Sequence, residues 1–206
     1  MVQAAAKSQS HSLERLRKAA RTLFVRDGYH QTRPQDIARE AGVANGTFYL
    51  HFKDKREAFL DFAAEAQNEL LAEYRARLEG VSQPRERLRT IFNTIVEFGT
   101  RNPGVMHAAF LDPVLIAPNE PDAWRMYDRM GQLLYAVVND SDIANLLDRQ
   151  FNLELISHAL CGMFGHAMTY AVRKELGAAE VIDELMAFIE RALPLGSIEL
   201  TPQPSN

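Results

Sequence analysis

Hydrogen-bonding side chains are concentrated in one short polar segment of the chain, between residues 45 and 55. Thr47 and Tyr49 supply hydroxyl groups and His51 supplies an imidazole, and all three can bond phosphate oxygens or base edges. Lys55 follows a few residues later, where its ammonium could reach a phosphate. This is the chemistry of recognition, and it depends on the element that presents these side chains.

Two short helical patterns meet at Gly42 within this part of the chain. The first is expected over about 32–41, with Thr32 capping its first turn and Gln35 completing a capping box. The second is expected over about 45–52, and glycine at the junction can take the positive φ of a tight turn. The second helix is too short and polar to form a core. That layout is typical of a helix-turn-helix, whose second helix enters the DNA major groove, so the sequence predicts DNA binding.

Charge is distributed unevenly along the chain. Residues 1–60 hold eleven Lys/Arg and six Asp/Glu, a balance of +5, whereas residues 61–206 hold twelve and twenty-one, a balance of −9. A basic end on an acidic body is expected of a nucleic-acid-binding head joined to a module that avoids DNA. Charged, solvated helices would give the same imbalance.

Composition favours a globular protein with a hydrophobic core. The chain has 206 residues, 47% of them hydrophobic and 24% charged, enough for one mid-sized domain or two small ones. No apolar run approaches the roughly 20 residues needed to span a bilayer. A single cysteine, Cys161, excludes an intrachain disulfide and fits a reduced compartment, so we expect a cytoplasmic protein with no membrane partner.

Helical periodicity runs through nearly the whole chain, and no stretch shows convincing strand alternation. The sequence therefore predicts an all-α fold of about nine helices. Besides the two short helices already described, helices are expected over about 13–27, 54–79, 84–101, 105–111, 122–138, 150–174 and 178–193.

About a dozen positions between residues 13 and 60 share the register of one known type of DNA-binding domain. These positions are Gly28, Thr32, Ile37, Ala38, Ala41, Gly42, Val43, Gly46, Thr47, Tyr49, Phe52, Lys55 and Phe59. In these residues the chain resembles the N-terminal domain of TetR-family transcriptional regulators. The later helices match only in number, length and order.

The resemblance implies an N-terminal three-helix helix-turn-helix domain followed by a larger helical domain. It also implies a homodimer, with the third helix of each subunit in a major groove, the last two long helices forming the dimer interface, and helices four to seven enclosing an effector pocket. The expected parts are a disordered arm over 1–12, the DNA-binding domain over 13–60, an effector-binding and dimerisation domain over 61–193, and a flexible tail over 194–206.

By resemblance, Thr47, Tyr49, His51 and Lys55 are the expected DNA contacts. Gly46 would let the third helix approach closely, where it could lie against a thymine methyl. Phe48 and Phe52 are expected to face the core of the head.

The chain departs from the family pattern in two places, at Arg33 with Pro34 and at Ala44. Arg33 stands where the family usually has Ser or Thr, and it could read guanine, grip a phosphate or remain solvated. Asn45 follows an alanine at a position that is often serine in the family. Capping of the third helix is the favoured role for Asn45, because asparagine is among the strongest N-cap residues, and contact with adenine is the alternative.

The last two long helices carry more apolar surface than one stripe, so each needs partners on more than one side. A monomer core would explain this, as would a dimer seam, and the TetR-like head favours the dimer because two heads must span a two-fold operator. The predicted interface residues are Leu155, Ala159, Gly162, Met163, His166, Val181, Leu185 and Phe188.

Aromatic and methionine side chains in the middle of the chain are candidates for an effector pocket, although most such residues are simply core. Their character would suit an apolar or aromatic small molecule. The candidates are Phe62, Phe92, Met106, His107, Phe110, Trp124, Tyr127 and Met130.

No catalytic residue, metal site or cofactor is predicted. The chain lacks the nucleophile-elbow, zinc-protease and phosphate-loop motifs. Glu154 and His158 share a helix face, but such a pair is more often structural than an acid–base couple. His158 and His166 lie eight residues apart, about 12 Å along a helix, which is too far to ligate one ion together.

Taken together, the sequence predicts a homodimeric repressor that is released from a palindromic DNA operator by a small-molecule effector. Two other classes remain open: a helical protein-interaction module that has lost DNA binding, and a small all-α enzyme. The basic head argues against the first, and the lack of a catalytic motif argues against the second.

Overall fold

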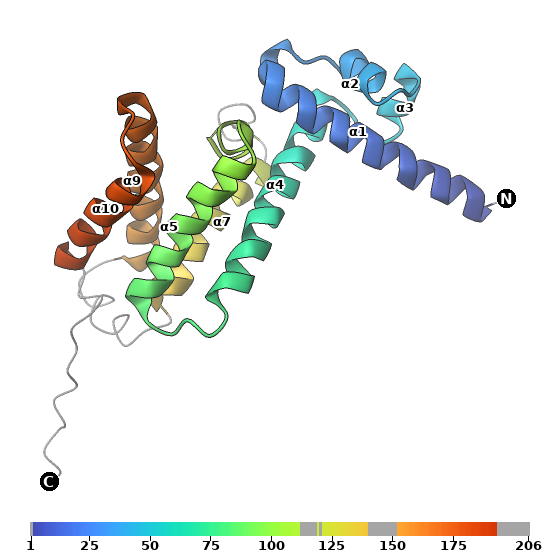
Figure 1. Ribbon diagram of the computed structural model, residues 1–206. Coiled ribbons are helices and arrows are strands. Elements are labelled where there is room, and N and C mark those ends of the chain that lie inside the picture. Colours follow the sequence, from blue (N-terminus) through green and yellow to red (C-terminus); the bar gives the residue numbers. More distant parts are fainter. Residues whose placement is uncertain (1, 112–118, 120, 140–151, 193–206) are drawn as a thin grey trace, which may run out of the picture. The chain divides into compact units, whose positions relative to one another are not determined.

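The computed structural model describes residues 2–111, 119, 121–139 and 152–192 (Figure 1). The described residues are helical and contain no strand, which confirms the predicted all-α fold. None of their helices has both the length and the hydropathy needed to cross a bilayer. The helices are α1 (Val2–Gln31), α2 (Pro34–Glu40), α3 (Asn45–Tyr49), α4 (Lys55–Leu78), α5 (Pro84–Arg101), the π-helix η1 (His107–Leu111), α7 (Pro121–Asn139), α9 (Leu153–Lys174) and α10 (Ala178–Ala192).

The chain forms two compact units. The first comprises Met1–Ala72 and Phe98–Tyr127, and the second comprises Glu73–Glu97 and Asp128–Asn206. The first unit contains α1, α2 and α3, which we call the head. The second contains α9 and α10.

The head is built on one apolar face of α1. Leu16, Leu23 and Phe24 on that face are almost completely buried. Helix α2 lies against α1 and contributes Ile37 to the same core, and α3 lies beside α2 (Figure 1). Phe48 is the fully buried residue of α3. The second helix therefore packs on the apolar face of the first.

Helix α1 is longer than expected. It begins at Val2, so the disordered arm predicted over residues 1–12 is wrong for residues 2–12. Gly28, with φ of 77°, interrupts the helical backbone near its end, in the left-handed region that glycine favours.

The capping box predicted at the start of α2 is wrong. The N-cap is Arg33, with φ of −120° and ψ of 153°, and no side chain caps this end. Pro34 explains the difference, because a residue that precedes proline is forced into extended backbone. Thr32 is buried instead, and its hydroxyl donates a hydrogen bond to the carbonyl of Gly28 at 2.8 Å.

The second unit packs α9 and α10 together with part of α5. The rings of Phe92 on α5 and Phe164 on α9 are stacked with centroids 4.3 Å apart. Arg89 on α5 is ion-paired with Asp183 on α10. Asn152 caps α9 by accepting a hydrogen bond from the N–H of Leu155. The predicted bounds of these two helices agree with the structure to within a few residues, and the predicted tail over 194–206 lies outside the described residues.

Candidate nucleic-acid interface

The turn between α2 and α3 is a Schellman motif centred on Gly42. The N–H of Val43 donates to the carbonyl of Ala38, and the N–H of Gly42 donates to that of Arg39, both at 3.0 Å. Gly42 has φ of 63°, in the left-handed region that only glycine adopts without strain. Arg15 of α1 donates from Nη2 to the Gly42 carbonyl at 2.9 Å. The turn is thus fixed both by its own backbone and by α1.

Helix α3 has one buried side and one exposed side. Phe48 is fully buried, and its ring lies 5.5 Å from that of Phe52, which is also buried. Tyr49, the neighbour of Phe48, is 51% exposed. Asn45 and Gly46 are exposed as well, and a Cβ added at Gly46 would meet nothing within 4 Å. The inward placement of both phenylalanines was predicted correctly, and α3 keeps a face that a groove could accept.

Asn45 is not the cap of α3. The N-cap is Ala44, with φ of −64° and ψ of 145°, and no side chain caps this helix. The carbonyl of Ala44 accepts the N–H of Thr47 at 2.8 Å, so the helix already begins one residue earlier than a capping Asn45 would allow. The capping role favoured by the sequence is therefore wrong, and the amide of Asn45 stands on the first exposed turn.

Lys55, the first residue of α4, is bonded to the end of α1. Its Nζ donates to the carbonyl of Tyr29 at 2.8 Å and lies 4.2 Å from the centroid of the Tyr29 ring. Burial lowers the pKa of this ammonium, and the charge of Arg33 lowers it further. Lys55 thus ties the start of α4 to the end of α1. The contact with phosphate remains a prediction.

Arg33 and Lys53 are both exposed, and within the described part of the chain neither makes an ion pair or a hydrogen bond through its side chain. Their charges are therefore available to an anion. By contrast, Arg39 of α2 is paired with Asp36 at 2.6 Å.

His51 joins the end of the α3 segment to α1. Its Nε2 lies 2.7 Å from the hydroxyl of Ser12, which also donates to the carbonyl of Gln9. The half-buried imidazole therefore has one nitrogen engaged with α1. Local sequence patterns do not predict this contact, because the two residues are 39 positions apart.

The start of α4 is held by a side-chain cap. Asp54 accepts the N–H of Glu57 at 2.9 Å, and the carboxylate of Glu57 accepts the N–H of Lys53. This arrangement fixes the backbone around Lys53 and Lys55.

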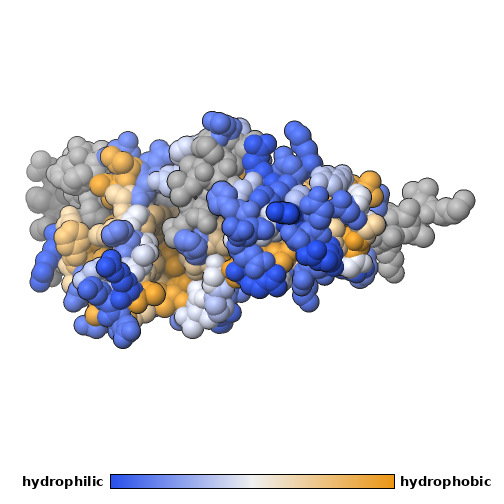
Figure 2. Space-filling view, turned by 90° about the horizontal axis from the view of Figure 1, so that it is seen from above, coloured by the Kyte–Doolittle hydropathy of each residue, from blue (hydrophilic) through white to orange (hydrophobic). Residues whose placement is uncertain are grey.

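The predicted dimer residues lie on α9 and α10, and none of them is buried within the chain. Leu155 is 65% exposed and Phe188 is 62% exposed. A Cβ added at Gly162 would meet nothing within 4 Å. Figure 2 shows hydrophobic residues reaching the surface on the left of the view, over α9 and α10. Such exposed apolar area on two adjacent helices is typical of an interaction surface.

The predicted effector residues are divided between the two units. In the first unit, Phe62 is buried, Met106 and Phe110 are half-buried, and His107, Trp124 and Tyr127 are exposed. In the second, Phe92 is buried against Phe164 and Met130 is half-buried. Their role in binding a ligand stays a prediction.

Two further side chains could have been reactive. Burial raises the pKa of the Cys161 thiol to about 11, so it is a poor nucleophile at neutral pH. His158 packs so closely on Gly131 of α7 that a Cβ there would collide with the imidazole. Among the described residues, no group of His, Cys, Asp and Glu could hold a metal ion.

Comparison with known proteins gives one family and several similar structures. The family model described as "Bacterial regulatory proteins, tetR family" matches residues 16–61. The fatty acid metabolism regulator protein of Bacillus subtilis is 29% identical over 75 residues, which are 36% of this chain and 39% of that relative. The chain thus aligns with about two fifths of the length of this relative.

Solved structures show the same fold over most of the chain. The fatty acid degradation regulator FadR of Bacillus halodurans superposes with a TM-score of 0.72 at 18% identity, covering 90% of this chain and 95% of that one. The FadR of Thermus thermophilus, a transcriptional repressor solved in complex with lauroyl-CoA, gives a TM-score of 0.65 at 24% identity and covers 94% and 99%.

Proposed function

Because the chain belongs to the TetR family of bacterial regulatory proteins, we propose that it is a transcriptional regulator that binds DNA through α3 and acts as a repressor. The observation that carries this proposal is the two-sided character of α3. Phe48 is fully buried on one side of the helix, while Asn45, Gly46 and Tyr49 stay exposed. A helix this short and polar gains little from packing, so its exposed side is best explained by a partner.

The proposed DNA contacts divide into base readers and phosphate binders. Asn45 and Gly46 lie on the first turn of α3, where an amide can bond adenine and a glycine can approach a thymine methyl. Thr47 and Tyr49 supply hydroxyls to phosphates or base edges. Arg33, exposed at the start of α2, is the candidate for a guanine or a phosphate.

Two predicted contacts have a structural task in addition. Lys55 bonds the Tyr29 carbonyl and His51 bonds Ser12, so each helps to hold the head together. An ammonium has three donors and an imidazole has two ring nitrogens, so a phosphate could still be bound by either. We propose that both lie at the edge of the interface.

We further propose a homodimer that joins two heads for a palindromic operator. The seam would be formed by α9 and α10, where Leu155 and Phe188 are exposed and Gly162 has open space beside it. Glycine at such a surface lets two helices cross closely. A two-fold dimer places its two recognition helices in successive major grooves.

We propose that the effector is a small molecule whose apolar part is bound by the helical body, and that a fatty acyl-CoA is the first candidate. The chain shares its fold with a repressor that was solved with lauroyl-CoA. The candidate residues remain the apolar and aromatic set predicted from sequence, which includes Phe62, Phe92, Met106, His107, Phe110, Trp124, Tyr127 and Met130. Release of DNA requires that the effector bind the DNA-free state more tightly.

The effector proposal is tested by titrating lauroyl-CoA into a complex of the protein with a fluorescently labelled operator. We expect anisotropy to fall as the operator is released, and the thermal midpoint of the DNA-free protein to rise. Free coenzyme A is the matched control and should do neither. If lauroyl-CoA changed neither the anisotropy nor the midpoint, the acyl-CoA proposal would be wrong, while DNA binding itself would stand.

A further inference from the structure

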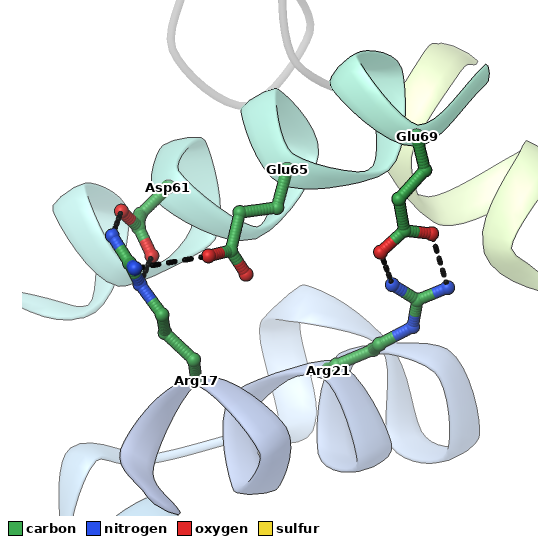
Figure 3. A network of polar contacts seen from close by, with 5 residues as sticks. All are labelled: Arg17, Arg21, Asp61, Glu65 and Glu69. Carbon is green, nitrogen blue, oxygen red and sulfur yellow. Dashed lines mark hydrogen bonds and ion pairs between the residues drawn. The ribbon is translucent and has the colours of Figure 1, made fainter. Parts of the chain in front are cut away.

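Two arginines of the basic head point toward helix α4 in the structure (Figure 3). Arg17 donates from Nε and Nη2 to the two carboxylate oxygens of Asp61, at 2.9 and 2.8 Å. Its remaining nitrogen, Nη1, lies 3.1 Å from Glu65. All three guanidinium nitrogens of Arg17 are therefore engaged with α4.

Arg21 repeats the pattern one turn further along α1. Its two terminal nitrogens bond both oxygens of Glu69, at 2.6 and 3.0 Å. Nη2 also donates to the side-chain oxygen of Asn102, at 3.2 Å, just beyond the end of α5. Arg21 thus connects three segments of the first unit: α1, α4 and the connection that follows α5.

The carboxylates form a ladder on α4. Asp61, Glu65 and Glu69 are spaced four residues apart, so they lie on one face of the helix. Like charges at this spacing repel one another. Burial raises the pKa of Glu65 and the neighbouring carboxylates raise it further, while the arginines of α1 act in the opposite direction. Two arginines of α1, also four residues apart, offset that repulsion. The matching four-residue spacing on the two helices means that the arginines of α1 can pair with the carboxylates of α4 in only one register.

A backbone contact supports the same registration. Gly104, with φ of 79°, packs so closely on α1 that an added Cβ would lie 2.8 Å from Cγ1 of Val25. This contact lies one helical turn beyond Arg21 on α1. The head is therefore held against the segment after α5 by both a polar and an apolar contact.

We propose that Arg17 and Arg21 are positioning residues for DNA recognition: they fix α1 on α4, and thereby the place at which α3 is presented, without binding phosphate. The proposal rests on the proposed function. It goes beyond it by removing two of the eleven basic residues of the first 60 from the set that attracts DNA directly. Bidentate pairing suits this task because it fixes orientation as well as distance.

The proposal makes an unusual prediction about charge. If only charge mattered, Glu69→Arg would strengthen DNA binding, since it makes the surroundings of the head more basic. If position matters, the same change places two cations face to face and weakens operator binding. We expect a loss of roughly threefold to tenfold. Glu79→Arg is the matched control, because Glu79 is exposed just after α4, and the same charge change there should not weaken binding.

Lysine substitution separates the two roles of an arginine. A phosphate contact tolerates lysine as a point charge, whereas a bidentate pair does not. We therefore expect Arg21→Lys to weaken operator binding about as much as Arg21→Glu does. The slope of log affinity against log salt should stay unchanged in Arg21→Lys, because no phosphate contact is lost.

The experiment measures operator affinity of the full-length protein over a salt series for Arg21→Lys, Arg21→Glu, Glu69→Arg, the swap Arg21→Glu/Glu69→Arg and Glu79→Arg. Thermal unfolding is followed in parallel. These pairs are partly exposed, so the variants are expected to remain folded. If the pairing of Arg21 with Glu69 positions α1, the swap should recover most of the affinity lost in either charge-reversal variant.

Three results would overturn the proposal: tighter binding by Glu69→Arg, wild-type affinity in Arg21→Lys, or no recovery in the swap while Arg21→Glu lowers the salt slope by about one. Failure of the proposed function looks different, because the wild-type protein would then bind no operator before any variant is compared.

Discussion

At the scale of residues, the interface separates side chains that are available to DNA from side chains that hold the head together. Tyr49 is exposed and lies on the outward face of α3, while Lys55 and His51 are bonded to α1. A count of basic residues does not make this distinction. Arg17, for example, contributes to the positive charge of the head but is bonded to carboxylates of α4. The surface available to DNA is therefore smaller than the charge suggests.

Tyr49→Phe removes one hydroxyl from the exposed face of α3. We expect operator affinity to fall by about tenfold if the hydroxyl bonds a phosphate, since a hydrogen bond to a charged group contributes about 1.5–3 kcal/mol. The thermal midpoint should not change, because the ring is half exposed. Fluorescence anisotropy on a selected operator measures the first quantity and circular dichroism the second.

Leu50→Ala is the matched control for Tyr49, because Leu50 is the next residue and is 72% exposed. It should bind the operator as the wild type does. Equal affinity in Tyr49→Phe, Tyr49→Ala and the wild type would mean that α3 does not present this face to DNA.

At the scale of elements, the sequence was most informative where structure is decided locally. The two short helices and the turn at Gly42 were predicted because periodicity and a glycine specify them. The two N-caps were predicted incorrectly. At α2 the restriction imposed by Pro34 outweighed the capping preference of Thr32. At α3 the backbone was already extended at Ala44, one residue before the preferred capping residue.

Contacts between distant residues could not be predicted from local patterns. The pairs Arg17–Asp61 and Arg21–Glu69 join residues 44 and 48 positions apart. The four-residue spacing of the arginines and of the carboxylates was visible in the sequence, but nothing local shows that the two ladders face each other. Likewise, exposure on α9 and α10 required the packed structure.

Two glycines in neighbouring elements should respond oppositely to alanine. Gly42→Ala forces a side chain into positive φ beside Arg15, so we expect the free energy of unfolding to fall by about 1 kcal/mol or more. Gly46→Ala adds a methyl group in open space on a helix, so stability should hold or rise slightly. Denaturant titration of both variants measures this difference.

Operator binding by the same two variants tests the approach of α3 to DNA. Gly46→Ala should remain folded yet bind the operator less tightly, because the new methyl group stands on the surface that meets the groove. Wild-type affinity in Gly46→Ala would place this residue outside the interface.

At the scale of the whole molecule, we propose that a DNA-reading head is joined to a helical body that binds a ligand and pairs with a second copy. The proposal of a second copy rests on the apolar residues that are exposed on α9 and α10. A charged residue substituted into this surface should therefore dissociate the proposed dimer without unfolding the subunit.

Phe188→Glu places a carboxylate on the proposed seam. We expect sedimentation velocity to show a shift from dimer to monomer, with helicity retained, since Phe188 is 62% exposed within the chain. Val172→Glu is the matched control. Val172 is 78% exposed, but at 100° per residue it falls on a different face of α9 from the predicted seam. A monomeric Val172→Glu together with a dimeric Phe188→Glu would move the interface elsewhere.

The most direct test of the account is selection of DNA fragments from a random pool by the purified protein at near-physiological salt, followed by sequencing. We expect enrichment of a palindrome whose half-sites are spaced for two successive major grooves. If a folded, dimeric preparation enriched no sequence at all, the central claim that α3 reads DNA would be contradicted.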